Sequence, residues 1–392
     1  MSVPCEQSTI SPGAPGQSAA SQSASGGSAI GGEPGDLPAL LTQAVQQGAS
    51  DLLLVAGKPP TIYARGQWRP LTERCLPAVE VAAALDAVLT DAQRTTLTTR
   101  QDLDFALAVS GVARFRANFH YQRGTLAAAF RVIPTGVPPL EELGLPPQVL
   151  SFADFPNGLV LVTGGTGQGK STTLAAILSH MNTTRSGHVI TIEDPIEFLF
   201  EHGTCLVEQR EIGADSPSFA GALRHVLRQR PDIILVGEMR DLETIATALT
   251  AAETGHLVLA SLHTSSAAQT IARIIDVFPA AQQPQVRTQL AASLRAIVCQ
   301  RLVRDRSKQA LVPAVEVLVG TAGIARAIRD NETHLVYGMI ETGKQRGMQT
   351  LEQSLAGLVR AGRIAPEEAL GAAADSGRLA RLLGIPTAEA AS

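Results

Sequence analysis

The sequence predicts an α/β protein whose main domain, over residues 142–320, is built on a parallel β-sheet. Segments with strand character alternate with helical segments along this stretch, and such alternation is typical of a parallel sheet covered by helices on both faces. In addition, residues 164–171 fit the phosphate-binding pattern G-x-x-x-x-G-K-[ST]. They lie where the pattern requires, between an apolar strand at 158–163 and a helix that starts near residue 172.

Two further parts are expected around this domain. Residues 1–36 consist almost entirely of Ser, Gly, Ala, Pro and Gln, a composition that cannot bury enough apolar surface to offset its ordering entropy. We therefore expect a disordered tail there, then a small α+β domain at 37–133 and a hinge at 134–141 with stiffening prolines. Residues 321–392 are rich in Ala, Leu and Arg with helical spacing, which predicts a helical C-terminal segment.

Hydrophobic periodicity places the individual elements. In the small domain it predicts helices at 37–47 and 79–89 and strands at 51–55, 62–64, within 104–118 and at 125–133. In the main domain the core strands are expected at 159–163, 189–193, 233–236 and 257–262. A helix after Ser218 carries Leu223, Val226 and Leu227 on one face.

Composition excludes several classes of protein. The net charge of −4 gives no global attraction to DNA or to anionic lipid. The four cysteines include no C-x-x-C pair, which argues against a structural zinc site and fits a reducing cytoplasm. No apolar run approaches the ~18–20 residues that span a bilayer, and the first residues do not resemble a secretory signal. We expect a cytoplasmic protein that contacts a membrane only through partners.

The glycine-rich loop predicts a site for a nucleoside triphosphate. Its backbone N–H groups and the following helix N-terminus would converge on the phosphates. Lys170 is expected to reach the β- and γ-phosphates, and the Ser171 hydroxyl is expected to bind Mg²⁺. The candidate nucleotide-binding residues are Gly164, Gly165, Thr166, Gly167, Gln168, Gly169, Lys170, Ser171 and Thr172.

Carboxylates follow two of the predicted strands. The strand at 232–236 is followed by Gly237 and Glu238, which places Glu238 where a neighbouring strand would present an acid to Mg²⁺ or to the attacking water. Glu193, Asp194 and Glu197 lie at the end of another strand, and one of them is a candidate general base. The alternatives are a surface acid that caps its strand and a solvated acidic loop.

Histidines and arginines complete the candidate residues. His256 and His263 flank one strand at opposite ends, so they are not expected to share a metal, whereas His263 could contact the γ-phosphate. Arg114 and Arg116 alternate with apolar residues and share one face of a strand in the small domain. An arginine from another domain or subunit commonly stabilises charge on a γ-phosphoryl group. From the residues alone, two alternatives stay open: a solvated basic face and a basic face that contacts nucleic acid.

Taken together, these blocks resemble the PilT family of secretion-type hexameric ATPases, over residues of about 38–365. The similarity is carried by the phosphate loop at 164–173, by an acidic box at 192–198 and by a histidine box at 250–264. Further matching blocks lie in the small domain, after the histidine box and near the end of the chain. These blocks are residues 113–116, 130–134, 164–173, 192–198, 233–241, 250–264, 271–279 and 347–351.

The resemblance implies a RecA-like ATPase domain, a PAS-like N-terminal domain and a helical C-terminal segment. By position it makes Glu197 the general base and Glu238 an acid near Mg²⁺ and the water. The remaining implied contacts to the phosphates or to Mg²⁺ are Lys170, Ser171, His263, Arg116 and Arg131. The family acts as a homo-hexamer that passes domain rotation to an inner-membrane platform protein, which removes pilin subunits from the pilus.

Several positions depart from the family pattern. Gly165 and Gln168 replace the usual Pro and Ser of the loop, and Arg230 stands where an acid is common. Ala325 replaces an arginine of a late motif, which bears on retraction more than on ATP hydrolysis. These changes fit a divergent paralogue, such as a PilU-like accessory motor that works beside another retraction ATPase.

Other functions remain as alternatives. A type II or type IV secretion ATPase or a pilus assembly ATPase would share the same blocks, but assembly ATPases usually carry a longer N-terminal region and a four-cysteine zinc insertion. A nucleic-acid translocase is disfavoured by the acidic balance and by the lack of interleaved aromatic and basic residues. A ring member that binds ATP without hydrolysing it is disfavoured because Lys170, Glu197 and Glu238 are present.

Overall fold

The computed structural model describes residues 36–386, with gaps at residue 65, at 134–135 and at 308–309. The predicted disordered tail at 1–36, apart from Asp36, lies outside the described residues, as does part of the predicted hinge at 134–141. Within the described ranges, no helix is both long and apolar enough to cross a membrane.

The N-terminal part is an α+β unit whose sheet has the order β3-β2-β1-β6-β5-β4, with every pair of neighbours antiparallel. Its elements are α1 (Leu37–Gln46), β1 (Ala49–Leu54), β2 (Thr61–Ala64), β3 (Gln67–Pro70), α2 (Ala78–Asp86), α3 (Asp91–Arg100), β4 (Asp102–Val109), β5 (Ala113–Gln122) and β6 (Thr125–Ile133). Residues of all three helices share one core with Phe115, Phe119 and Phe130 of the sheet. The helices therefore cover one face, and the alternate residues of β5 and β6 lie on the other.

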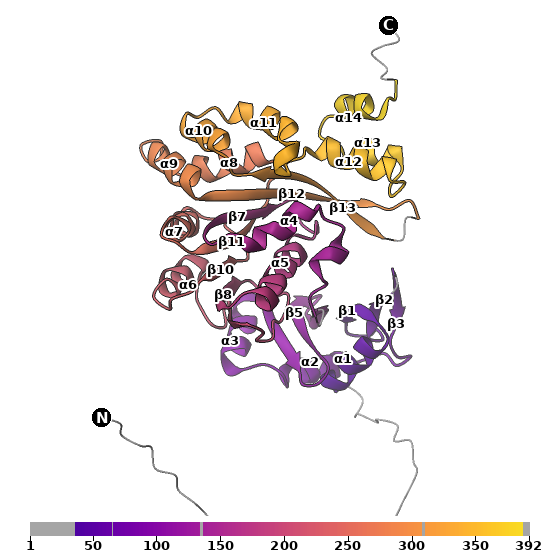
Figure 1. Cartoon of the computed structure of the whole chain (residues 1–392). Coiled ribbons are helices and arrows are strands. Elements are labelled where there is room, and N and C mark those ends of the chain that lie inside the picture. Colours follow the sequence, from indigo (N-terminus) through magenta and orange to yellow (C-terminus); the bar gives the residue numbers. More distant parts are fainter. Residues whose placement is uncertain (1–35, 65, 134–135, 308–309, 387–392) are drawn as a thin grey trace, which may run out of the picture.

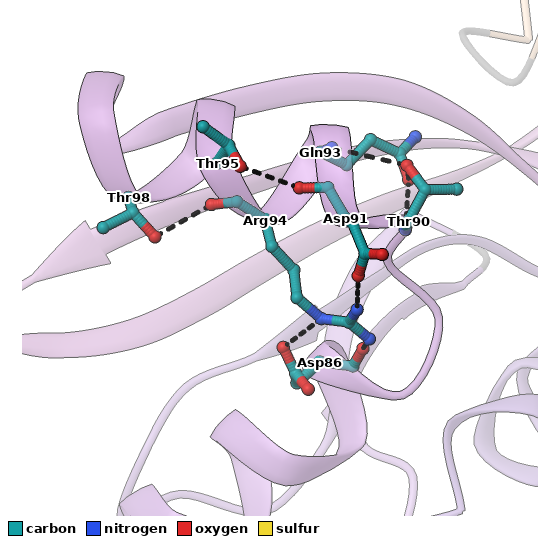
Figure 2. A network of polar contacts seen from close by, with 7 residues as sticks. All are labelled: Asp86, Thr90, Asp91, Gln93, Arg94, Thr95 and Thr98. Carbon is teal, nitrogen blue, oxygen red and sulfur yellow. Dashed lines mark hydrogen bonds and ion pairs between the residues drawn. The ribbon is translucent and has the colours of Figure 1, made fainter.

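Helix α3 was not expected, because Leu97 is its one buried residue and it lacks an apolar stripe. Capping specifies it instead. Thr90 accepts a hydrogen bond from the backbone of Gln93, and the Gln93 side chain bonds back to the Thr90 backbone (Figure 2). Arg94 then ties the first turn to α2, because its guanidinium contacts Asp91 at 2.7 Å and Asp86 at 2.8 Å.

The second sheet has the order β13-β12-β7-β11-β10-β8-β9. Its strands are β7 (Gly158–Thr163), β8 (Gly187–Glu193), β9 (Cys205–Glu211), β10 (Ile233–Val236), β11 (Leu257–Leu262), β12 (Leu294–Arg304) and β13 (Leu311–Val319). The four predicted core strands are β7, β8, β10 and β11, and they are parallel as expected. The prediction that the strand before Glu238 is next to the strand before the phosphate loop was wrong, because β11 lies between β10 and β7. The sheet is not parallel throughout, because β13 is antiparallel to β12 at one edge.

Helices cover both faces of this sheet, which explains why β7, β10 and β11 are buried at every residue. One core contains residues of α6 (Phe219–Val226), α7 (Leu242–Glu253), α8 (Ala267–Asp276) and α9 (Gln283–Ser293). The core on the opposite face contains residues of α4 (Pro147–Leu150) and α5 (Lys170–Thr184). Successive residues of β7 contribute alternately to the two cores.

The C-terminal segment is helical as predicted, but it packs in two places (Figure 1). Helices α10 (Ala322–Arg329) and α11 (Val336–Thr342) join the core of α7, α8 and α9. Helices α12 (Leu351–Arg360), α13 (Pro366–Ala372) and α14 (Ser376–Leu383) form a separate core with the ends of β12 and β13. The C-terminal helices lie at the β12–β13 end of the second sheet, and the N-terminal unit lies near β8, towards the opposite end (Figure 1).

Candidate active site

The glycine-rich loop joins the carboxyl end of β7 to the N-terminus of α5, as the motif requires. Gly164 has φ of 147°, and a Cβ there would lie 2.4 Å from the carbonyl oxygen of Gln300. Gly169 has φ of 77° at the N-cap of α5, in the left-handed region that favours glycine. The loop therefore needs glycine at both positions in order to turn tightly against β12.

Lys170 is the first residue of α5 and is 8% exposed. Its Nζ donates hydrogen bonds to the carbonyl oxygens of Gly164 at 3.0 Å and Gly165 at 2.9 Å, so the ammonium lies over the loop. Burial lowers the pKa of Lys170, while the negative charges of Glu238 and Glu197 act in the opposite direction. Both acids are thus close enough for their charges to act on this ammonium.

Two glutamines fasten the loop to β12. Gln300, 6% exposed in β12, donates through Nε2 to the carbonyl oxygen of Gln168 and accepts through Oε1 from the Thr173 hydroxyl, both at 2.8 Å. The Gln168 side chain accepts from the backbone N–H of Leu302 at 2.5 Å. Gln300 was not among the predicted site residues, although a glutamine within the apolar run of β12 was a possible signal. Gln168 was predicted as a nucleotide-binding residue of the loop, whereas its side chain binds the backbone of β12 in the structure.

Glu238 follows β10 after one glycine, and its side chain is 18% exposed. One carboxylate oxygen lies 2.7 Å from the Arg240 guanidinium and the other lies 3.1 Å from Nε2 of His263, at the end of β11. Burial alone raises the pKa of Glu238, but the hydrogen bond from Arg240 and the charge of His263 outweigh it, so the pKa is lowered overall. Glu238 therefore remains ionised at neutral pH. Arg240 was not among the predicted site residues.

The three acids at the end of β8 and in the turn that follows it differ in environment. Glu193 accepts from the Thr191 hydroxyl at 2.7 Å, the Gln209 amide at 3.3 Å and the Glu197 N–H at 3.3 Å. Burial raises the pKa of Glu193, and these hydrogen bonds partly offset the effect. Asp194 and Glu197 are exposed, and the charge of Glu197 acts on Lys170. Glu193 is thus held by three hydrogen-bond donors, whereas the side chains of Asp194 and Glu197 are exposed at this sheet edge.

The two histidines lie at opposite ends of β11, as predicted. The ring of His256 has Nδ1 at 3.0 Å from the carbonyl oxygen of Ala251, at the end of α7, which is a structural contact. His263 shares Glu238 with Arg240.

Among the described residues, no arginine of the N-terminal unit contacts the phosphate loop of its own chain. Arg116 and Arg131 face each other across β5 and β6, and Arg131 is 70% exposed and pairs with Asp51 at 2.9 Å. Arg114 points from the same face to Glu211 at the end of β9. One chain therefore brings Lys170, Glu197, Glu238 and His263 to one sheet edge, without Arg116 and Arg131.

A parallel sheet with a G-x-x-x-x-G-K-[ST] loop at its carboxyl edge and an acid at the end of a nearby strand defines a P-loop protein of the α/β class. Consistent with this class, residues 131–360 match the family model described as Type II/IV secretion system protein. The chain is 48% identical over 334 residues to the type IV pilus retraction ATPase PilT of Pseudomonas aeruginosa, covering 85% of this chain and 97% of that protein.

Two further comparisons agree. The type IV pilus ATPase PilU of the same organism is 41% identical over 344 residues, covering 88% of this chain and 90% of that protein. A crystal structure of the pilus retraction motor PilT with bound ADP superposes with a TM-score of 0.83 at 44% identity, covering 88% of this chain and 99% of that one. The chain therefore belongs to the PilT family of type II/IV secretion system proteins, which confirms the resemblance and the fold class derived from the sequence.

Proposed function

We propose that this chain is a subunit of an ATP-hydrolysing motor that powers the retraction of type IV pili. The observation that carries the proposal is the position of Lys170, whose buried ammonium lies over the loop within the field of Glu238 and Glu197. A cation for the phosphates and two acids for the metal and the water thus meet at one sheet edge. The 48% identity to a pilus retraction ATPase supports the choice of motor.

The residues present fit a magnesium ion. Mg²⁺ prefers oxygen ligands, binds few protein groups and takes its remaining ligands from water and substrate phosphates. The Ser171 hydroxyl in the first turn of α5 and the ionised Glu238 carboxylate would hold it. When bound, Mg²⁺ would neutralise charge on the phosphates.

The remaining groups then have distinct tasks. Lys170 would bind the β- and γ-phosphates, and backbone N–H groups of residues 164–172 would surround them. Glu197, at the exposed turn after β8, would orient the attacking water and take its proton. His263 would hydrogen-bond the γ-phosphate from the end of β11, while Glu238 sets the position of its ring.

Arg116 and Arg131 would act on the site of a neighbouring subunit. They lie side by side on the sheet face that the N-terminal helices do not cover, and Arg131 is largely exposed. This placement fits a homo-hexameric ring in which each N-terminal domain completes the next site. Rotation of these domains would be passed to an inner-membrane platform protein, so the motor would work at the cytoplasmic face of that membrane.

An accessory motor of the PilU kind is the second candidate, because the chain is also 41% identical to PilU over most of its length. The substitutions at Gln168 and Ala325 bear on that choice without affecting Lys170, Glu197 or Glu238.

Substitution of Glu238 by glutamine tests the proposal because it removes the charge and keeps the shape. The Glu238→Gln chain should bind ATP normally and lose at least about 100-fold in kcat in a purified ATPase assay. In Pseudomonas aeruginosa cells that lack PilT, the unaltered chain should restore twitching motility and the variant should not. Normal turnover by the variant would remove Glu238 from the mechanism, and failure of the active chain to restore motility would favour the accessory motor.

A further inference from the structure

The loop that carries Glu197 is fastened to the sheet by three side chains. Glu193 of β8 accepts a hydrogen bond from the backbone N–H of Glu197 at 3.3 Å. Gln209 of β9 donates to the carbonyl oxygen of Phe198 at 2.8 Å. Glu211, the last residue of β9, accepts from the backbone N–H of Ile196 at 3.1 Å. The residue directly before Glu197 is thus held by Glu211.

Glu211 also contacts the other domain. The same carboxylate oxygen that binds the Ile196 N–H lies 2.5 Å from the guanidinium of Arg114 in β5. The side chain of Glu211 is 7% exposed and that of Arg114 is 23% exposed, so the pair is largely removed from water. Among the described residues, neither Glu193 nor Gln209 has a hydrogen bond or ion pair to the N-terminal domain.

The position of Arg114 makes this contact sensitive to domain orientation. Arg114 is opposite Ile133, the last residue of β6 before the chain passes to the second domain. The ion pair therefore adds a second connection beside the covalent one. In addition, Nε of Arg114 is buried with no hydrogen-bond partner among the described residues. The Arg114 guanidinium therefore binds Glu211 through a single nitrogen atom.

We propose that Arg114 and Glu211 are positioning residues that transmit the orientation of the N-terminal domain to the loop that carries Glu197. A buried carboxylate that loses its cation must find another partner or become hydrated. When the N-terminal domain turns, the Glu211 carboxylate shifts, the N–H of Ile196 loses its acceptor, and Glu197 moves away from the water. This inference rests on the proposed function, specifically on Glu197 as the general base.

The test is a double-mutant cycle in the full-length chain, with kcat and ATP affinity measured separately. Arg114→Met removes the charge but keeps an extended apolar side chain, and Glu211→Gln keeps the size of the acid. Each change should lower kcat roughly tenfold and alter ATP affinity less than about twofold, because neither residue touches the phosphates. The double variant should be no slower than the slower single variant, because both changes break the same link.

The matched control is Arg94→Met. Arg94 is also an arginine of the N-terminal domain with carboxylate partners, but Asp86 and Asp91 lie in that same domain (Figure 2). This variant should keep the kcat of the unaltered chain. Arg114→Lys should recover part of the kcat that Arg114→Met loses. If Arg114→Met does not fold, the kcat of Arg114→Lys tests the inference in its place.

The outcomes separate this inference from the proposed function. If the unaltered chain hydrolyses ATP, if Glu197→Gln is slow and if Arg114→Met has normal kcat, the inference alone is wrong. Losses that multiply in the double variant, or an equal loss of ATP affinity, would also overturn it. A chain that does not hydrolyse ATP, or a Glu197→Gln variant with normal kcat, would contradict the underlying mechanism and this inference with it.

Discussion

The Glu238 carboxylate has two side-chain partners, and these contacts explain why an acid that is 18% exposed stays ionised. The Arg240 guanidinium and the His263 ring each contact one of its oxygens. The contact with Nε2 of His263 lets Glu238 fix the position of that ring. At Lys170 burial dominates instead and lowers the pKa, and the charges of Glu238 and Glu197 offset only part of the effect.

Glu316 of β13 is a buried acid, 4% exposed, and it accepts a hydrogen bond from the N–H of Ala267 at the start of α8 at 2.7 Å. Burial is the main reason that its pKa is raised from 4.5 to about 7, and the charge of Glu352 adds to the effect. Between these two values the folded chain binds a proton that the unfolded chain has released. The contribution of Glu316 to the free energy of unfolding is therefore complete below about pH 4.5 and is lost as the pH rises through about 7.

We predict that Glu316→Gln removes this pH dependence, because glutamine keeps a hydrogen-bond acceptor but does not titrate. Relative to the variant, the unaltered chain should lose up to about 3 kcal/mol of unfolding free energy between pH 5 and pH 8. Denaturant unfolding at a series of pH values measures the difference. Parallel pH profiles for the two chains would mean that Glu316 does not titrate in this range.

At the scale of elements, the phosphate loop takes its shape from β12 as well as from its own glycines. Gln300 satisfies two groups of the loop and the following helix, the Gln168 carbonyl oxygen and the Thr173 hydroxyl. A buried polar group that loses its partner costs about 1–3 kcal/mol.

Gln300→Leu should therefore weaken ATP binding by roughly tenfold, because the loop no longer keeps its shape. Titration with a fluorescent ATP analogue measures the affinity. Gln289→Leu is the control, because Gln289 contacts Glu253 on an exposed surface away from the loop. Equal affinities for the two variants would show that the glycines alone shape the loop.

The elements also show how far the sequence could be read. Strands β7, β8, β10 and β11 were predictable because each is a short apolar run, and the loop motif fixed the position of α5. Helix α3 lacks an apolar stripe and depends on the capping of Thr90 and Gln93. The antiparallel pairing of β13 and the contacts of Gln300, Arg240 and Glu211 depend on residues far apart in the chain, which a local pattern does not contain.

At the scale of the whole molecule, the candidate site is divided between domains. The loop and the acids belong to the second sheet, whereas Arg116 and Arg131 lie on the N-terminal sheet without a contact to the loop among the described residues. If each N-terminal domain completes the site of the next subunit, every complete site lies between two neighbouring subunits of the ring.

Mixing two inactive variants should therefore restore activity. Lys170→Ala and Arg131→Ala chains should each hydrolyse ATP poorly, because each lacks one half of every site. Mixed rings contain some interfaces with both an intact Lys170 and an intact Arg131, and a coupled phosphate-release assay should detect their turnover. A mixture no more active than its components would show that the arginine acts within its own chain or not at all.

Mg²⁺-dependent release of phosphate from ATP, measured with the purified full-length chain and with Lys170→Ala, tests whether the phosphate loop binds and hydrolyses the nucleotide. We expect steady turnover by the unaltered chain and none above background by the variant, because the variant lacks the cation that binds the β- and γ-phosphates. Equal turnover by the two chains, or no binding of ATP by the unaltered chain, would contradict the proposed ATPase site.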